Sequence, residues 1–227
     1  MKKLKNGWVN YWKERVKGKG EYYGKHGRNS DKIIALLKIK KSDKVFDIGC
    51  ATGADLSDIR NKTGAKCYGI DISPIAVKLN KDKKIKLKVA DMEKTTFPNK
   101  FFTKVFSFGV FEHTPRSYNV FRELNRIMKK EGIAYISFPN KYSFFHITKN
   151  IKMILGTWDL GYEKSFTKSE VKKILEKTGF RLKAYWVEPH IKPGNIFNHL
   201  DNLLNKLNNK HFGFFINFIA EKIKDVK

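Results

Sequence analysis

The chain has 227 residues, of which 41% are hydrophobic, and it carries a formal net charge of +25. This length is enough for one well-buried domain with modest additions, and it excludes two full domains. No apolar run approaches the roughly 18 residues of a membrane-spanning helix, and the basic N-terminus lacks the apolar segment of a signal peptide. We therefore expect a cytoplasmic protein, with peripheral contact at a membrane surface left open.

Two short helices are predicted first, over residues 8–16 and 30–37, with Ser30 expected to cap the second. The chain then alternates β-rich runs with helical segments, which predicts parallel βαβ units. Strands are expected at 44–48, 66–71, 86–90, 104–108 and 133–138, and helices at 54–62, 74–81 and 116–129. Residues 130–132, Lys-Glu-Gly, are expected to turn the chain into the strand at 133–138.

Beyond residue 138 the pattern loosens in two stretches, 141–163 and 188–211. The first is too long for an ordinary connection in a compact domain, and we interpret it as a substrate-side insertion. Between the two stretches, Thr167 and Glu170 form an S/T-x-x-E capping box that predicts a helix over 168–177. The remaining predicted elements are a strand over 180–187, an amphipathic helix near 197–207 and an apolar strand over 213–220.

The most informative segment is VFDIGCATGAD, residues 45–55, where an apolar strand runs into a glycine-bearing turn that opens a helix. Glycines let a backbone turn tightly and approach a ligand, and a helix N-terminus offers unpaired N–H groups and a positive dipole end. The segment therefore predicts a site for a nucleotide-like ligand. Asp47 lies inside the apolar strand, where an unpaired carboxylate is costly, so we expect it to accept hydrogen bonds from N–H groups of the turn.

Two further acidic residues follow the next predicted strands, and in an open α/β sheet the carboxyl ends of the strands form the ligand crevice. Asp71 lies 18 residues after Gly53, where its carboxylate can accept hydrogen bonds from ribose hydroxyls. The alternative is that Asp71 caps the helix beginning at residue 74, a role that Ser73 can also fill. Asp91 suits the exocyclic amine of adenine, with Met92 adding a backbone N–H and apolar packing.

One signature of class I S-adenosylmethionine (SAM) dependent methyltransferases is D-x-G-x-G-x-G, and this chain resembles it, with alanine at the middle glycine, at Asp47, Gly49, Ala51 and Gly53. The segment FSFGVFEHTP and the phrase from Phe166 to Phe180 also look like segments of small-molecule, type 11-like members. The resemblance implies an α/β fold: a seven-stranded Rossmann-like sheet flanked by helices, its last strand antiparallel between the fifth and sixth. It also implies a single domain over 1–227, with an N-terminal helical cap at 1–43, a SAM-binding core at 44–138, and substrate-side insertions at 139–166 and 188–212.

The same resemblance implies which residues contact SAM. Its methionine part is expected against the turn from Gly49 to Gly53, which includes Cys50, and its adenine against Ile72. Gly109 and Val110 are expected near the amino-acid end of the cofactor. Glu112 and His113 are then expected to face the substrate mouth. No metal is expected, because Gly109 stands where some quinone-pathway relatives have the first glutamate of a metal-binding E-x-x-E-H run.

His113 is the candidate catalytic residue, because an imidazole is suited to act as general base on a hydroxyl or phenol at neutral pH. The alternative is that this histidine only caps or packs. The chain lacks the N-P-P-Y-like motif that suggests amino methylation of adenine or glutamine, and the Pro-Cys motif that suggests carbon methylation of cytosine or uracil. The leading hypothesis is therefore O-methylation of a small-molecule, glycan or lipid-linked acceptor.

Two other hypotheses stay open at this point. The net charge favours an RNA methyltransferase, although only seven of the 47 basic residues are arginine, so a lysine-rich composition without a binding role is the competing explanation. The third hypothesis is a non-catalytic nucleotide-binding protein on the same fold. The two cysteines, Cys50 and Cys67, fall in predicted core elements and are expected to be buried free thiols.

Overall fold

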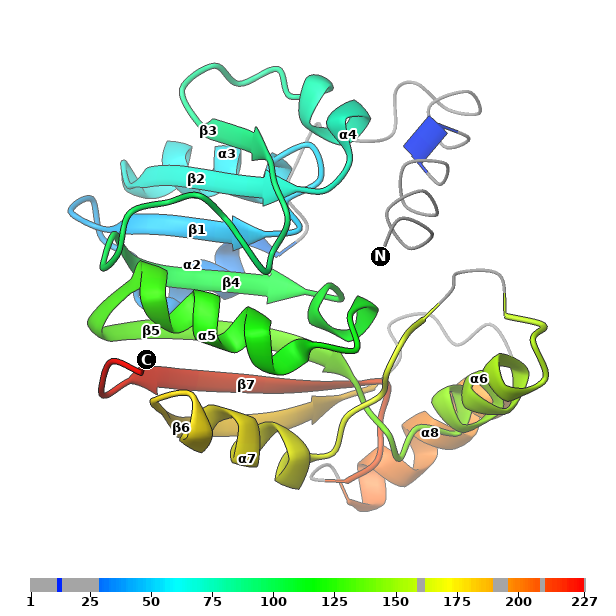
Figure 1. Cartoon of the computed structure of the whole chain (residues 1–227). Helices are drawn as coiled ribbons and strands as arrows, with labels where there is room; N and C mark the ends of the chain where they lie inside the picture. Colours follow the sequence, from blue (N-terminus) through cyan, green and yellow to red (C-terminus); the bar gives the residue numbers. More distant parts are fainter. Residues whose placement is uncertain (1–11, 14–28, 159–161, 190–195, 209–210, 227) are drawn as a thin grey trace.

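The computed structural model describes residues 12–13, 29–158, 162–189, 196–208 and 211–226. These residues form a seven-stranded sheet flanked by helices (Figure 1). The strands are β1 (Lys44–Ile48), β2 (Lys66–Asp71), β3 (Lys86–Val89), β4 (Phe102–Phe108), β5 (Met128–Pro139), β6 (Phe180–Glu188) and β7 (Phe215–Lys222). The helices are α2 (Ser30–Leu37), α3 (Ala54–Thr63), α4 (Pro74–Lys78), the 3-10 helix η1 (Phe111–His113), α5 (Ser117–Ile127), α6 (Phe144–Ile154), α7 (Lys168–Lys177) and α8 (Ile196–Leu207).

The strand order across the sheet is β3-β2-β1-β4-β5-β7-β6. Strands β1 to β5 pair in parallel, whereas β7 lies antiparallel between β5 and β6. The predicted α/β fold and the insertion of the last strand are thereby confirmed. Because parallel strands end at one edge of a sheet, the segments that follow β1, β2, β3 and β4 meet there.

The central strands of the sheet are buried on both faces, which explains why they read as nearly continuous apolar runs. On β1, Phe46 packs into the core that includes residues of α5 and α7, whereas its neighbour Val45 packs into the core formed with α2 and α3. Both side chains are fully buried. Figure 1 shows the same division, with α5 and α7 in front of the sheet and α2 and α3 behind it.

The junction between α5 and β5 differs from the prediction. The helix was expected to reach residue 129, but α5 ends at Ile127 and β5 begins at Met128. Met128 pairs with Phe102 across a register shift in β4, and Glu131, expected in a turn, has φ +66° inside the strand. The helical spacing of residues 116–129 was therefore overridden by strand pairing in the assembled sheet.

Smaller differences concern caps and ends. Ser30 was expected to cap α2, but the N-cap is Asn29 and Ser30 is the first residue of the helix. The capping box of Thr167 and Glu170 is confirmed by both of its hydrogen bonds. Helix α4 ends at Lys78 rather than at residue 81, and the last strand spans 215–222 rather than 213–220. The stretch 141–163 contains helix α6, and most of the helix expected at 8–16 lies outside the described residues.

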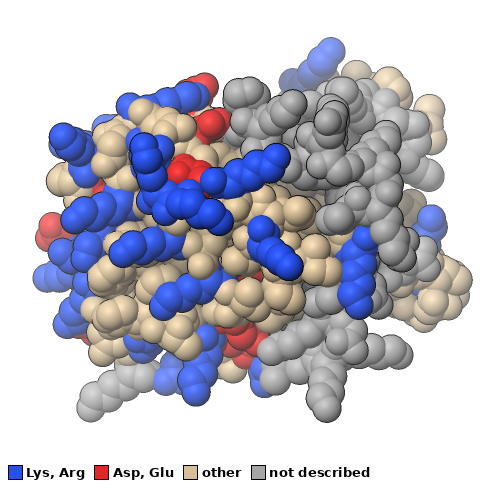
Figure 2. Space-filling model, turned by 90° about the horizontal axis from the view of Figure 1, so that it is seen from above, with Lys and Arg blue, Asp and Glu red and all other residues tan. Residues whose placement is uncertain are grey.

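Lysine dominates the charged surface. Figure 2 shows Lys and Arg side chains spread over the described part of the visible face rather than gathered into one stripe. Some lysines lie over aromatic rings, with Lys44 Nζ 3.8 Å from the ring centre of Phe101 and Lys168 Nζ 3.9 Å from that of Tyr185. Part of the lysine excess therefore packs on the protein itself. None of the helices in the described part of the chain is long and apolar enough to cross a membrane.

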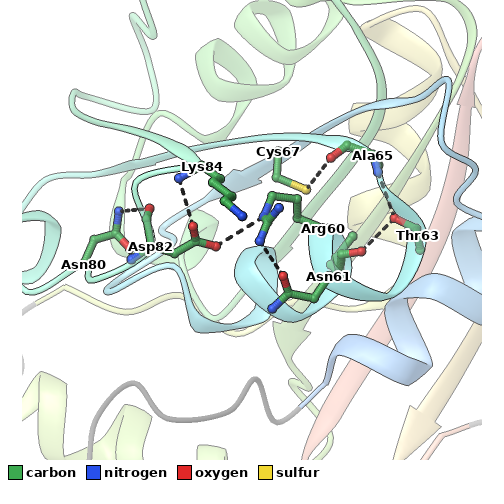
Figure 3. Close-up of polar contacts among 9 residues, drawn as sticks. Arg60, Asn61, Thr63, Ala65, Cys67, Asn80, Asp82 and Lys84 are labelled. Atoms are coloured by element: carbon green, nitrogen blue, oxygen red, sulfur yellow. Dashed lines mark hydrogen bonds and ion pairs between the residues drawn. The ribbon is translucent and has the colours of Figure 1, made fainter.

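A polar cluster fastens α3 to the loop that precedes β3 (Figure 3). The Nε atom of Arg60 lies 3.3 Å from Oδ2 of Asp82, whose Oδ1 accepts a hydrogen bond from the backbone N–H of Lys84 at 2.8 Å. Burial alone would raise the pKa of Asp82, but the hydrogen bonds from Lys84, Ser57 and Arg60 lower it. The cluster therefore holds the start of β3 against the last turn of α3.

Candidate active site

The turn after β1 combines a tight backbone with a helix N-terminus that no side chain caps. Gly49, Ala51 and Gly53 have φ values of +84°, +50° and +79°, and Gly53 is the N-cap of α3 without a capping side chain. The carbonyl of Ile70 accepts hydrogen bonds from the N–H groups of Gly49 and Cys50 at 2.8 and 2.9 Å. The turn is therefore fastened to the end of β2, while the first-turn N–H groups of α3 lack a side-chain partner of the capping kind.

Glycine is required at both ends of this turn. A Cβ atom on Gly49 would lie 2.2 Å from Cγ2 of Val110, and one on Gly53 would lie 2.7 Å from Cδ1 of Ile85. Both positions also have the positive φ that disfavours other residues. The predicted site residues Gly49 and Val110 are thus in contact, which brings the segment after β4 against the turn after β1.

Asp71, at the end of β2, holds the turn through its side chain. Its Oδ2 atom accepts a hydrogen bond from the N–H of Ala51 at 2.9 Å, and its Oδ1 atom accepts one from the N–H of Ser73 at 2.8 Å. Burial raises the pKa of Asp71, and the backbone donors at Ser73, Ala51 and Ile72 oppose that rise. The hydroxyl of Ser73 caps α4 by accepting from Ala76 N at 3.3 Å, so the capping role considered for Asp71 belongs to Ser73.

Asp47 does not make the contacts that the sequence suggested. The N–H groups expected to bind it are used elsewhere, because Gly49 and Cys50 donate to Ile70 and Ala51 donates to Asp71. The hydrogen bonds between described residues include none to the Asp47 carboxylate, which is 7% exposed. Burial raises its pKa well above the usual range, and the nearby charges of Asp55 and Asp71 add to the rise. A cationic ligand group would relieve this environment.

The remaining predicted cofactor residues follow β2 and β3. The N–H of Ala90 donates to the carbonyl of Asp71 at 3.1 Å, which brings the segment of Asp91 beside that of Asp71. The Oδ1 atom of Asp91 accepts from the N–H of Glu93 at 3.0 Å. Ile72 and Met92 are half-buried, and Met92 packs against the core. Acidic and apolar side chains therefore alternate along this edge, which suits a ligand with both hydroxyl groups and a flat apolar ring.

The thiol of Cys50 stays within the turn, where it lies 3.8 Å from the carbonyl oxygen of Ala51. Its side chain is buried, and a Cβ on Gly69 of β2 would lie 2.7 Å from its Sγ atom. Burial raises the pKa of this thiol well above its usual value. Cys50 and Cys67 are both buried free cysteines, as predicted.

The segment after β4 brings Gly109, Val110, Glu112 and His113 to the same edge. Glu112 was expected at the substrate mouth, but it is 2% exposed, and its Oε2 atom has no hydrogen-bond partner among the described residues. Burial raises the pKa of Glu112 to about 8. The Nδ1 atom of His113 lies 3.3 Å from the carbonyl oxygen of Tyr162. Burial lowers the pKa of His113, although the charge of Glu163 and the carbonyls of Tyr162 and Gly109 oppose that change.

A buried ion pair beside this segment was missed at the sequence level. Lys149 of α6, 1% exposed, places its Nζ atom 2.7 Å from Oε1 of Glu163 and 3.1 Å from the hydroxyl of Ser165. The charges of this pair influence the pKa values of both Glu112 and His113. The stretch 141–163 contains three lysines and two acidic residues, and nothing in their spacing indicates that Lys149 and Glu163 meet.

The comparisons with known proteins agree with this geometry. A family model described as a methyltransferase domain matches residues 23–185. The chain is 31% identical to the uncharacterized protein MJ1252 of Methanocaldococcus jannaschii, covering 90% of this chain and 91% of that protein. It is also 30% identical to the ubiquinone biosynthesis O-methyltransferase of Pelagibacter ubique, covering 83% of this chain and 82% of that enzyme. A chain in the Haloferax volcanii complex between a methyltransferase activator and a methyltransferase superposes with a TM-score of 0.71 at 15% identity, covering 96% of this chain and 97% of that one.

The chain therefore belongs to the methyltransferase domain family, and within it to the class I SAM-dependent enzymes. Its cofactor is SAM, which is converted to S-adenosylhomocysteine. The edge of the sheet suits this molecule chemically, because carboxylates are available for hydroxyl and cationic groups and a helix N-terminus is available for a carboxylate.

Proposed function

We propose that this enzyme transfers the methyl group of SAM to an oxygen atom of a small-molecule, glycan or lipid-linked acceptor. The observation that carries the proposal is His113, a half-buried histidine on η1, directly after the segment that contacts the glycine-bearing turn. The similarity to an O-methyltransferase over 83% of the chain supports oxygen as the acceptor atom.

Methyl transfer from SAM requires an acceptor oxygen in line with an electrophilic methyl group carried on a positively charged sulfur. The contribution of this chain is to position the acceptor and to take its proton. Because burial lowers the pKa of His113, its ring is neutral at neutral pH and accepts the hydroxyl proton as the oxygen–carbon bond forms and the sulfur–carbon bond breaks. The Glu163 carboxylate and the Tyr162 carbonyl both favour the protonated ring, so they stabilise the product of that proton transfer.

We propose the following contacts for the cofactor. The Asp71 carboxylate accepts from the ribose hydroxyls with the lone pairs that Ala51 and Ser73 leave available. The Asp47 carboxylate faces a cationic group of SAM, because its burial without a hydrogen-bond donor from the turn calls for one. The other proposed contacts come from the turn, from the adenine-side residues and from the segment after β4: Gly49, Cys50, Ala51, Gly53, Ile72, Asp91, Met92, Gly109 and Val110.

The test combines a binding and a turnover measurement on His113→Ala and His113→Gln. With methyl-labelled SAM and a cell extract as the source of acceptor, we expect the rate of label transfer to fall about 10²- to 10⁴-fold in both variants. SAM affinity measured by calorimetry should stay within about twofold of the wild type, which corresponds to a change of less than about 0.5 kcal/mol in binding free energy. An unchanged transfer rate would show that His113 only packs, and label confined to nucleic acid would contradict the acceptor class.

RNA is the second candidate acceptor, and the observation that favours it is the net charge of +25. Against it stands the distribution of that charge, since Lys and Arg side chains are spread over the face in Figure 2 and some lysines lie over aromatic rings. A dedicated RNA surface would retain RNA with a steep dependence on salt concentration. Filter-binding of labelled RNA at several salt concentrations measures this directly, and loss of all binding at physiological ionic strength would exclude the RNA acceptor.

A further inference from the structure

Helices α6 and α8 pack against each other beyond the carboxyl ends of β4 and β5 (Figure 1). Asp201 of α8 joins them, because its Oδ2 atom accepts from the hydroxyl of Ser143 at 2.5 Å and its Oδ1 atom accepts from the N–H of Phe144 at 2.8 Å. Asp201 is fully buried. The two helices are therefore held to one another by buried polar contacts at the start of α6.

Both helices have the reverse of the usual distribution of side chains. Buried positions are polar: His146 and Lys149 on α6, and Asn198, Asp201 and Asn205 on α8. Six of the exposed positions on the two helices are aliphatic and follow helical spacing, and we call them the α6–α8 face: Ile147, Ile151, Ile154, Leu200, Leu203 and Leu207. The most open of them, Ile154 and Leu207, are 84% and 78% exposed. Scattered apolar residues on a surface need no explanation, but a row at helical spacing on each of two neighbouring helices indicates a binding surface.

The charges on these helices indicate what binds there. Asp201 is the only acidic residue in the sequences of α6 and α8, and it is buried. The exposed charged side chains on the two helices are Lys152 and Lys206. Aliphatic rows flanked by lysines without exposed acids are typical of helices that lie in the interface of an anionic membrane.

A second copy of the chain fits the same face less well. Docking two copies through it would bring together two chains that each carry a net charge of +25, and would place lysines opposite lysines. An anionic bilayer attracts the same charges and accepts the aliphatic side chains without a matching protein groove. We propose that the α6–α8 face docks this enzyme on an anionic lipid bilayer, with the aliphatic side chains inserted and Lys152 and Lys206 at the headgroups.

The proposal is tested by vesicle flotation with nuclease-treated protein. We expect binding to phosphatidylcholine vesicles that contain phosphatidylglycerol, and little binding to phosphatidylcholine alone. In Ile151→Asp and Leu203→Asp the bound fraction at limiting lipid should fall about tenfold or more, since each change removes an inserted side chain and adds a negative charge. The matched control is Ile223→Asp, an exposed isoleucine outside both helices, 39% exposed, which should bind like the wild type. Equal binding by all variants, or no binding by the wild type, would overturn the proposal.

A second measurement avoids any loss of folding. The native cysteines Cys50 and Cys67 are buried, so a nitroxide label reacts selectively at an introduced surface cysteine. In Ile154→Cys the label should become more accessible to oxygen and less accessible to a water-soluble quencher when vesicles are added, whereas in Ile223→Cys it should not change. Sedimentation velocity without lipid provides the other outcome: self-association that Ile151→Asp abolishes would assign the face to a second copy and reject the bilayer.

Discussion

The carboxyl group of Glu112 gives the sharpest quantitative prediction. It is 2% exposed, and its Oε2 atom lacks a hydrogen-bond partner among the described residues. Burial raises its pKa from 4.5 to about 8; the charge of Glu163 adds to the rise, and its own backbone N–H and Lys149 oppose it. At neutral pH the folded protein therefore holds this side chain as a neutral acid.

The direction in which the free energy of unfolding changes with pH follows from proton binding. Between pH 4.5 and 8 the folded state holds a proton on Glu112 that the unfolded chain has lost, so the free energy of unfolding decreases as the pH rises through this range. Each pKa unit is worth about 1.4 kcal/mol. The rise of the Glu112 pKa from 4.5 to about 8 therefore sets a ceiling of about 5 kcal/mol on the stability lost once the pH exceeds about 8. Glu112→Gln stays neutral at every pH and should not lose this stability.

The assay is urea unfolding of the wild type and Glu112→Gln from pH 5 to pH 9. The two free energies of unfolding should nearly coincide at the acidic end, and the variant should become more stable by a few kcal/mol at the alkaline end. Other buried acids, such as Asp47, cancel in the difference if they are independent of the change. Glu176→Gln is the matched control, because the Glu176 side chain is 57% exposed. Parallel curves for the wild type and Glu112→Gln would refute the reasoning.

Three further changes test the site. Gly49→Ala should destabilise the protein by about 2–4 kcal/mol in urea unfolding, from the positive φ and the contact with Val110, and adding Val110→Ala should recover only the contact part; no loss in Gly49→Ala would contradict the geometry. Asp71→Ala should weaken SAM binding in calorimetry by tenfold to about a hundredfold, since charge-assisted hydrogen bonds are worth about 1.5–3 kcal/mol; unchanged affinity would remove Asp71 from the cofactor site. Lys149→Met should cost about 3–5 kcal/mol by leaving Glu163 buried without its cation, and adding Glu163→Gln should reduce that cost; equal losses in both variants would show that the ion pair is not the cause.

The sequence predicted strands β1 and β2 with their observed bounds because both strands are largely buried. Apolar runs such as β1 and the glycines of the following turn are determined by local chain geometry, so their bounds could be inferred from residue type. The end of α5 could not, since Met128 continues the helical spacing and only its pairing with Phe102 makes it a strand residue.

Helix α6 and the buried ion pair between Lys149 and Glu163 were missed for a related reason. A helix is recognised when its apolar side chains face the core, whereas α6 buries His146 and Lys149 and exposes Ile151. The contact of Lys149 with Glu163 depends on how the stretch 141–163 folds back, which spacing alone does not determine. The same limit applies to Asp47, whose expected hydrogen-bond donors are used by Ile70 and Asp71.

The position of β7 has a consequence for synthesis of the protein. Strand β6 pairs only with β7 in the described sheet, and β7 also closes the far side of β5. A nascent chain that has not yet released residues 215–222 from the ribosome therefore exposes two unpaired strand edges and the apolar side chains that face them. The sheet cannot be completed progressively from the N-terminus, so its final assembly waits for translation to reach these residues, and the half-made protein is the state in greatest need of chaperones.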